Sequence, residues 1–99
     1  MNNAELTQRD FAVLWHPCTQ MKDHEQLPLI PIKKAHGIYL EDFDGNRYID
    51  AISSWWVNLF GHTNSYINSK IKEQLDTLEH VILAGFTHEQ VVRLSERLI

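Results

Sequence analysis

The sequence has one cysteine, four separate glycines and no long hydrophobic run. No apolar segment approaches the ~18 residues that a membrane span needs, so we expect no membrane partner. Cys18 has no second cysteine with which to form an internal disulfide, which is typical of a reducing compartment. The N-terminus also lacks the basic and apolar regions of a secretory signal. Together these features predict a cytoplasmic protein.

Basic residues are scarce and dispersed. Nine Lys and Arg residues stand against thirteen Asp and Glu residues, which gives a net charge of −4 with His neutral. The only adjacent basic pair is Lys33-Lys34. Nucleic-acid surfaces and surfaces for anionic lipid both require clustered positive charge. We therefore expect neither kind of partner.

Complete catalytic and metal-binding patterns are missing as well. Among the six histidines and the one cysteine, only His16 and Cys18 lie close together, and no second pair completes a tetrahedral ligand set. A calcium loop over Asp42, Asp44 and Asn46 would lack its bidentate glutamate. There is no glycine-rich phosphate loop and no nucleophilic serine turn. We expect no metal site, and residue chemistry alone indicates no catalytic centre.

The sequence predicts a short helix near the N-terminus. The ninety-nine residues of the chain form at most one small domain. Residues 1–5 are expected to be a loose end, and Thr7 is the predicted cap of a helix over residues 8–15, with Asp10 as its capping-box partner. Residues 18–28 are polar and predict an extended connection.

Alternating short runs between residues 31 and 50 predict a small antiparallel sheet of two or three strands. Asp44-Gly45-Asn46 supplies the positive-φ residues that a tight hairpin requires. Gly37 marks the other turn of this sheet, or a bulge.

Two helices are expected after residue 64. The first covers residues 65–79, and its apolar face consists of Ile67, Ile71, Leu75 and Leu78. Residues 81–86 form an apolar loop that we expect to pack inward. Thr87 is the predicted cap of the second helix, with Gln90 as its box partner, and no stop signal precedes Ile99.

The order of these elements predicts an α+β fold in four parts. They are an N-terminal arm (1–28), the small antiparallel sheet (29–50), a connection that contains two tryptophans (51–64) and a helical part (65–99) whose last helix is expected to continue past its end. On an extended backbone, Trp55 and Trp56 would point to opposite faces, so that one ring enters a core and the other lines a pocket. The alternative is that both are core residues.

Six short motifs follow one another in the order of a known family. They occupy residues 15–18, 37–40, 44–50, 53–56, 61–62 and 85–88. Together they closely resemble the N-terminal segment of the adenosylmethionine-8-amino-7-oxononanoate aminotransferase family, a branch of the class III aminotransferases. The Asp-Gly-x-x-Tyr-x-Asp pattern is common to class III, whereas Trp-His-Pro and Ser-Ser-Trp-Trp are specific to this branch. The resemblance covers residues 11–99.

The resemblance implies the N-terminal segment of a fold type I transferase that uses pyridoxal 5'-phosphate and works as a homodimer, with active sites at the subunit interface. The family transfers an amino group from S-adenosylmethionine, or in some members from lysine, to 7-keto-8-aminopelargonate, which gives 7,8-diaminopelargonate in biotin biosynthesis. It implies a substrate-binding role for Trp55, the first tryptophan of the pair. Position 18 is often a substrate-recognition tyrosine in this family, which implies a substrate-binding role for Cys18 as well. Because Cys18 replaces the tyrosine, the amino donor stays open.

Two other interpretations remain open. One is another class III aminotransferase, acting on an ω-amino acid. The other is a non-catalytic module that associates with itself through exposed apolar surface.

The resemblance also implies that the phosphate loop, the pyridine-nitrogen partner and the Schiff-base lysine of the cofactor site all follow residue 99. We therefore predict that the 99-residue chain alone neither binds the cofactor covalently nor transaminates. A pyridoxal-phosphate absorbance titration with borohydride trapping checks this, and we expect no aldimine band and no trapped lysine. A saturable band with one modified lysine would contradict the prediction.

Overall fold

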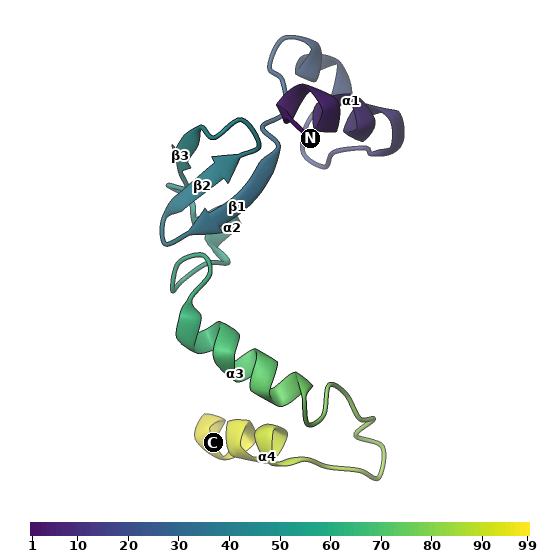
Figure 1. The fold of residues 1–99 in the computed structure, drawn as a ribbon. Coiled ribbons are helices and arrows are strands. Elements are labelled where there is room, and N and C mark those ends of the chain that lie inside the picture. Colours follow the sequence, from purple (N-terminus) through teal and green to yellow (C-terminus); the bar gives the residue numbers. More distant parts are fainter. The chain divides into compact units, whose positions relative to one another are not determined.

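The structure is a computed structural model that describes residues 1–99, and it divides into two units, Met1–Asn64 and Ser65–Ile99. The first unit contains helical segments and a three-stranded sheet, and the second contains two helices (Figure 1). The helical segments are α1 (Asn3–Val13), the 3-10 helix η1 (Met21–Glu25), α2 (Ser53–Trp56), α3 (Ser65–Leu75) and α4 (Glu89–Leu98). The predicted α+β class is confirmed.

The sheet is antiparallel and lies within the predicted range of residues 31–50. Its strands, in the order in which they pair, are β1 (Ile32–His36), β2 (Tyr39–Asp42) and β3 (Arg47–Ile49). Because β2 is central, Leu40 pairs with Ala35 on one side and with Tyr48 on the other. The register of β1 against β2 shifts between Ile32 and Lys34, which places a bulge on an edge strand.

Both predicted turns of the sheet are confirmed. Gly37, with φ +58°, lies between β1 and β2, and Gly45, with φ +90°, lies between β2 and β3. Glycine adopts positive φ without strain because it has no Cβ. The Asp42 N–H donates to the Asn46 carbonyl at 3.0 Å, which closes the second turn.

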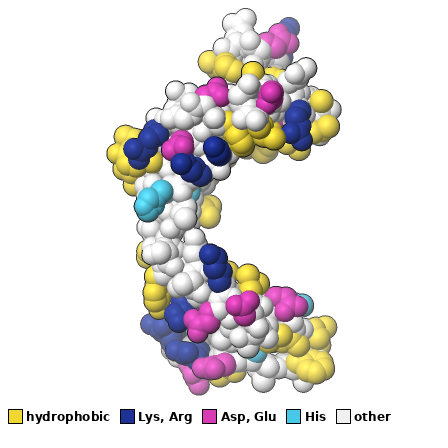
Figure 2. Space-filling model, in the orientation of Figure 1, with side chains coloured by type: hydrophobic (Ala, Val, Ile, Leu, Met, Phe, Trp, Pro, Cys, Tyr) yellow, Lys and Arg dark blue, Asp and Glu magenta, His cyan; other side chains and the backbone are white.

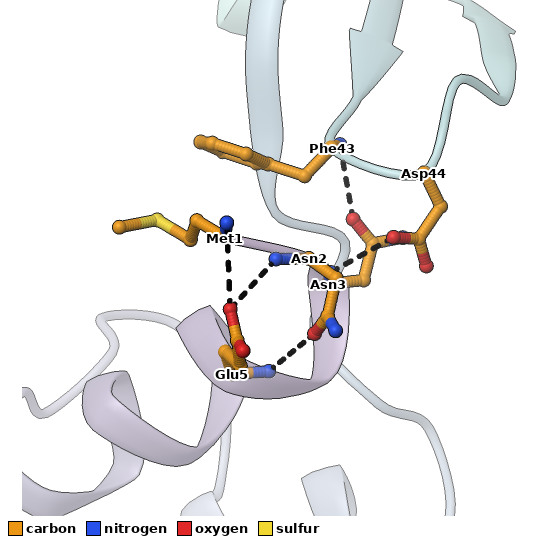
Figure 3. Close-up of polar contacts among 6 residues, drawn as sticks. All are labelled: Met1, Asn2, Asn3, Glu5, Phe43 and Asp44. Atoms are coloured by element: carbon orange, nitrogen blue, oxygen red, sulfur yellow. Dashed lines mark hydrogen bonds and ion pairs between the residues drawn. The ribbon is translucent and has the colours of Figure 1, made fainter.

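The first helix starts earlier than predicted, because its cap is Asn2 rather than Thr7. The side-chain oxygen of Asn2 accepts from the Glu5 N–H at 2.9 Å, and the Glu5 carboxylate accepts from the Asn2 N–H at 3.0 Å (Figure 3). This reciprocal capping box satisfies two of the N–H groups that the first helical turn leaves unpaired. The prediction of a loose end at residues 1–5 is therefore wrong.

Asn3 joins α1 to the turn between β2 and β3. Its side-chain amide donates to the Asp42 carboxylate at 2.9 Å, and its side-chain oxygen accepts from the Phe43 N–H at 3.0 Å. The Asn3 N–H also donates to the Asp44 carboxylate at 3.1 Å (Figure 3). Polar contacts from Asn3 thus connect the N-terminal helix to the sheet.

Residues 18–28 and the end of the third helix differ from the prediction. The segment 18–28 contains η1, so it is not extended throughout. Helix α3 starts at Ser65 as predicted but ends at Leu75. The N–H groups of Thr77 and Leu78 both donate to the Gln74 carbonyl, and this tightened turn ends the helix.

The predicted capping box of the last helix does not form. His88 occupies the cap position of α4 with an extended backbone, φ −148°, and no side chain caps the helix. The helix therefore begins at Glu89, after Thr87, and Gln90 lies inside its first turn.

No apolar side chain is fully buried in this structure. The loop of residues 81–86, predicted to pack inward, exposes 59% of Ile82 and 62% of Phe86, because nothing else in its unit covers it. Figure 2 shows hydrophobic side chains at the surface of each unit. In the first unit, side-chain hydrogen bonds of Asn3 connect α1 to the hairpin, whereas the side-chain hydrogen bonds and ion pairs within α3 and α4 are local to each helix.

We predict that Asn3→Ala loosens the attachment of α1 to the hairpin, because the variant loses both side-chain contacts and keeps only the backbone contact to Asp44, with the capping box intact. Hydrogen–deuterium exchange should then be faster at the Phe43 amide. Asn2→Ala is the matched control: it removes the cap, which costs about 1 kcal/mol of helix stability, but leaves the Phe43 contact in place. Equal exchange at Phe43 in the two variants would contradict the role given to Asn3.

Candidate functional site

Asp42, at the end of β2, is fully buried. Its carboxylate accepts five hydrogen bonds of 2.8–3.0 Å, from the side chains of Asn3, Asn46 and Tyr48 and from the N–H groups of Asp44 and Asn46. A carboxylate that is removed from water needs such donors, because desolvation opposes its charge.

The donors decide the charge of Asp42. Burial raises the pKa of its carboxyl group, but the hydrogen bonds from Asn46, Asn3 and Tyr48 outweigh burial and bring the pKa well below its usual range. In return, the hydrogen bond to Asp42 raises the pKa of Tyr48. Asp42 is therefore an ionised residue that organises the backbone, and both of its oxygens are already engaged.

The Ser-Ser-Trp-Trp motif forms a left-handed helical turn, α2. Its φ angles are +51°, +46°, +68° and +67° for Ser53, Ser54, Trp55 and Trp56, and ψ is +51° and +48° at the two central residues. Residues with a Cβ avoid this region, at roughly 1–2 kcal/mol each. The extended backbone considered for the two tryptophans is not found, and the turn requires compensating contacts.

Asp50, directly after β3, provides those contacts. One carboxylate oxygen accepts from the Ser54 N–H at 2.8 Å, and the other accepts from the Ser54 hydroxyl and from the His62 Nε2–H, both at 2.7 Å. The Asp50 side chain is only 5% exposed. The hydrogen bonds from the N–H and hydroxyl of Ser54, followed by that from His62, lower the pKa of Asp50 to about 2. Asp50 is thus ionised at neutral pH.

His62 is fixed to the turn between β1 and β2. Its N–H donates to the Gly37 carbonyl at 2.8 Å, and the Gly37 N–H donates to the His62 carbonyl at 3.0 Å. A Cβ at Gly61 would lie 3.1 Å from the Gly37 oxygen, so a glycine is needed where the two chains approach. The partner of Asp50 is therefore positioned by the sheet itself.

The left-handed turn presents both tryptophan rings at the surface. The ring centroids of Trp55 and Trp56 are 6.1 Å apart and the ring planes are at 87°, an edge-to-face pair. The two side chains are 59% and 74% exposed. Neither ring lies in a core, so both predicted placements of the pair in a core are wrong for this structure.

Cys18, the second predicted substrate-binding residue, lies in a turn before η1. Its side chain is exposed and its φ is +59°, again in the left-handed region. In the same motif, His16 Nε2 lies 2.6 Å from the Asp10 carboxylate, so Asp10 pairs with His16 and does not cap α1. Cys18 and Trp55 share no hydrogen bond or ring contact in this structure.

Neither Lys70 nor the buried carboxylates of Asp42 and Asp50 fit a role in a pyridoxal-phosphate site. A Schiff-base lysine needs a lowered pKa, but Lys70 is paired with Glu73 at 2.7 Å, and that hydrogen bond raises the pKa of Lys70. Both carboxylate oxygens of Asp42 and of Asp50 already accept hydrogen bonds inside the fold, and both side chains are almost completely removed from solvent. No three His, Cys, Asp or Glu side chains are grouped to hold a metal ion. None of the helices has the length and apolar character to cross a membrane.

Sequence reasoning assigned no role to Asp50, Ser54 and His62. A signal was present, because each lies in one of the resembling motifs: Asp50 ends the Asp-Gly-x-x-Tyr-x-Asp pattern, and His62 follows Gly61. Their spacing in the sequence does not predict the contact, because Asp50 and His62 are 12 residues apart. The backbone bridge between Gly37 and His62 brings the two side chains together.

Comparison with known proteins gives the family. Residues 19–99 match the family Aminotransferase class-III. The chain belongs to this family.

Individual relatives give a narrower comparison than the family does. The chain is 59% identical over 93 residues to the adenosylmethionine-8-amino-7-oxononanoate aminotransferase of Helicobacter pylori, covering 94% of this chain and 21% of that protein. A crystal structure of the enzyme with the same name from Methanocaldococcus jannaschii matches with a TM-score of 0.89 and 38% identity, covering 98% of this chain and 22% of that one. An ω-transaminase from Pseudomonas jessenii in complex with PMP matches with a TM-score of 0.85 and 28% identity, covering 95% and 21%. The chain thus spans about a fifth of the length of these relatives.

The contacts of Asp50 predict a pH dependence. A carboxyl group whose pKa is lowered to about 2 in the folded state, against about 3.9 in an unfolded chain, contributes stability above pH 4. That contribution is lost as the pH falls from about 4 to about 2. We expect the near-ultraviolet circular dichroism of the tryptophan pair to change in this interval, and Asp50→Asn to remove that part of the change. An identical acid titration in the Asp50→Asn variant would contradict this assignment.

Proposed function

We propose that this chain is the N-terminal segment of a pyridoxal-phosphate-dependent aminotransferase that converts 7-keto-8-aminopelargonate into 7,8-diaminopelargonate in biotin biosynthesis. The observation that carries the proposal is the 59% identity over 93 residues to the Helicobacter pylori relative, whose name states this acceptor. The remaining part of such an enzyme would provide the cofactor's lysine and its phosphate site. The four parts 1–28, 29–50, 51–64 and 65–99 are then regions of one N-terminal segment.

In this proposal Trp55 contacts the amino acceptor. The acceptor contains a long methylene chain, and an indole ring covers such a chain with a large apolar area at low entropy cost. The exposure of the Trp55 ring at the left-handed turn supports this role.

Cys18 is also proposed to contact substrate. Its thiol is smaller than the tyrosine that the family often carries at this position, and it neither stacks nor donates as a phenol does. The amino donor is accordingly S-adenosylmethionine or lysine. The exposed side chain and the left-handed backbone of Cys18 support its place at a binding surface.

The complete enzyme is proposed to be a cytoplasmic homodimer that uses pyridoxal 5'-phosphate. The exposed apolar side chains of both units support contact with further polypeptide and with a second subunit. The structural match to a transaminase bound to PMP, the aminated form of this cofactor, supports the choice of cofactor. The single cysteine supports a reducing compartment.

The alternatives have weaker support. An ω-amino-acid aminotransferase is favoured by the match to the Pseudomonas jessenii ω-transaminase, but at 28% identity rather than 59%. A non-catalytic, self-associating module is compatible with the exposed apolar side chains, but not with a match that spreads over 94% of the chain to one biosynthetic enzyme.

A hybrid enzyme tests the proposal. In it, this chain replaces the matching segment of the Helicobacter pylori relative, so that the rest of the polypeptide supplies the cofactor site. We expect the hybrid to form 7,8-diaminopelargonate with S-adenosylmethionine or lysine as donor, and Trp55→Ala to raise the KM for the acceptor about tenfold, as loss of an aromatic anchor does. Trp56→Ala is the control and should change this KM less. A hybrid that binds the cofactor but does not aminate the acceptor would overturn the proposal.

A further inference from the structure

We propose that Asp50, Ser54 and His62 form a latch that positions Trp55 for substrate, and that Asp50 is its central positioning residue. This inference rests on the proposed function, because it takes Trp55 to be a substrate contact. None of the three latch residues is itself proposed to touch the substrate.

The backbone of the motif requires such a device. Four consecutive residues with a Cβ, 53–56, have positive φ, and this conformation is unfavourable for each of them. The hydrogen bonds from the Trp56 N–H to the Ile52 carbonyl and from the Val57 N–H to the Ser53 carbonyl, both 2.9 Å, close the turn but are equally available to an unstrained helix. Contacts from outside the turn must therefore select the left-handed form.

Asp50 makes the contacts that do so. It binds Ser54 twice, through the N–H at 2.8 Å and the hydroxyl at 2.7 Å, and so fixes the residue directly before Trp55. An ionised acceptor forms stronger hydrogen bonds than a neutral one. The carboxylate is 5% exposed, so water competes little for these bonds.

His62 ties this carboxylate to the sheet. Its Nε2–H donates to Asp50 at 2.7 Å, while its backbone pairs in both directions with Gly37. Asp50 is also fixed through its own N–H, which donates to the Ile38 carbonyl at 2.8 Å. Through these hydrogen bonds the latch fixes the tryptophan turn to the β1–β2 turn.

The direction of the Trp55 side chain depends on this backbone. The Cα–Cβ bond of a residue with φ +68° points differently from that of the same residue in a right-handed or extended chain. When the latch is broken, the turn relaxes toward negative φ and the ring leaves its place. The expected consequence is weaker binding of the acceptor with little change in the chemical step.

The test uses the full-length hybrid enzyme. We expect Asp50→Ala to raise the KM for 7-keto-8-aminopelargonate about tenfold, comparable to the loss of a hydrogen bond to a charged group, and to leave kcat at saturating acceptor nearly unchanged. The edge-to-face pair of Trp55 and Trp56 also couples their transitions, so the far-ultraviolet circular dichroism of the pair should weaken in the same variant. Trp56→Phe identifies that signal.

Glycine provides the rescue. Since glycine adopts positive φ freely, the double variant Asp50→Ala/Ser54→Gly removes the strain at one of the four residues and should partly reverse the rise in KM and the loss of the dichroic signal, although it lacks the latch. The matched control is Asp76→Ala, which removes an exposed carboxylate outside the latch and should change neither readout. A residue that merely supports the fold would not be rescued by a glycine at position 54.

The outcomes separate the two proposals. An active hybrid in which Asp50→Ala leaves KM and the dichroic signal unchanged overturns the latch and leaves the proposed function standing. Failure of the glycine rescue, or a parallel loss of kcat and cofactor content, also overturns the latch, because the effect would then be general destabilisation. A hybrid that binds the cofactor but does not aminate the acceptor overturns the proposed function, and with it the role of the latch in substrate binding.

Discussion

The first unit depends on the carboxylate of Asp42, because hydrogen bonds to it connect elements that no hydrophobic core joins. Donors from α1, from the β2–β3 turn and from β3 meet on two oxygen atoms: Asn3, Asn46 and Tyr48 each donate to it through a side chain. Removing a donor leaves a buried charge with fewer partners, which is more costly than losing a hydrogen bond in water. Helix, turn and strand are therefore stabilised together rather than one by one.

Asp50 has a similar role at the other end of β3, but it acts on a different kind of turn. The turn beside Asp42 contains Gly45, whose positive φ is unstrained, whereas the turn beside Asp50 has positive φ at residues that carry a Cβ. Glycine in place of Trp55 would relieve the strain at that residue but would remove the ring. A strained backbone that is compensated by a buried carboxylate is thus the arrangement that keeps an indole at this point of the surface.

These differences explain what the sequence could predict. The hairpin was accessible because Asp44-Gly45-Asn46 determines its turn locally. The start of α1 was also encoded locally, in the pair Asn2 and Glu5, and was missed because that signal stands at the very beginning of the chain. The left-handed turn had no local signal, since Ser and Trp have no preference for positive φ. It depends on Asp50 and on His62, whose proximity only the fold establishes.

Asp50 connects two motifs that differ in how widely they occur. The Asp-Gly-x-x-Tyr-x-Asp pattern, which ends at Asp50, resembles class III aminotransferases in general, whereas Ser-Ser-Trp-Trp resembles one branch. In the structure, Asp50 of the class III pattern accepts two hydrogen bonds from Ser54 of the Ser-Ser-Trp-Trp motif. A different turn held by the same carboxylate would present a different side chain without a change to the sheet. Under the proposed function, residues 53–56 carry the contact to the acceptor, and the cofactor chemistry belongs to lysine and phosphate contacts outside the sheet of this chain.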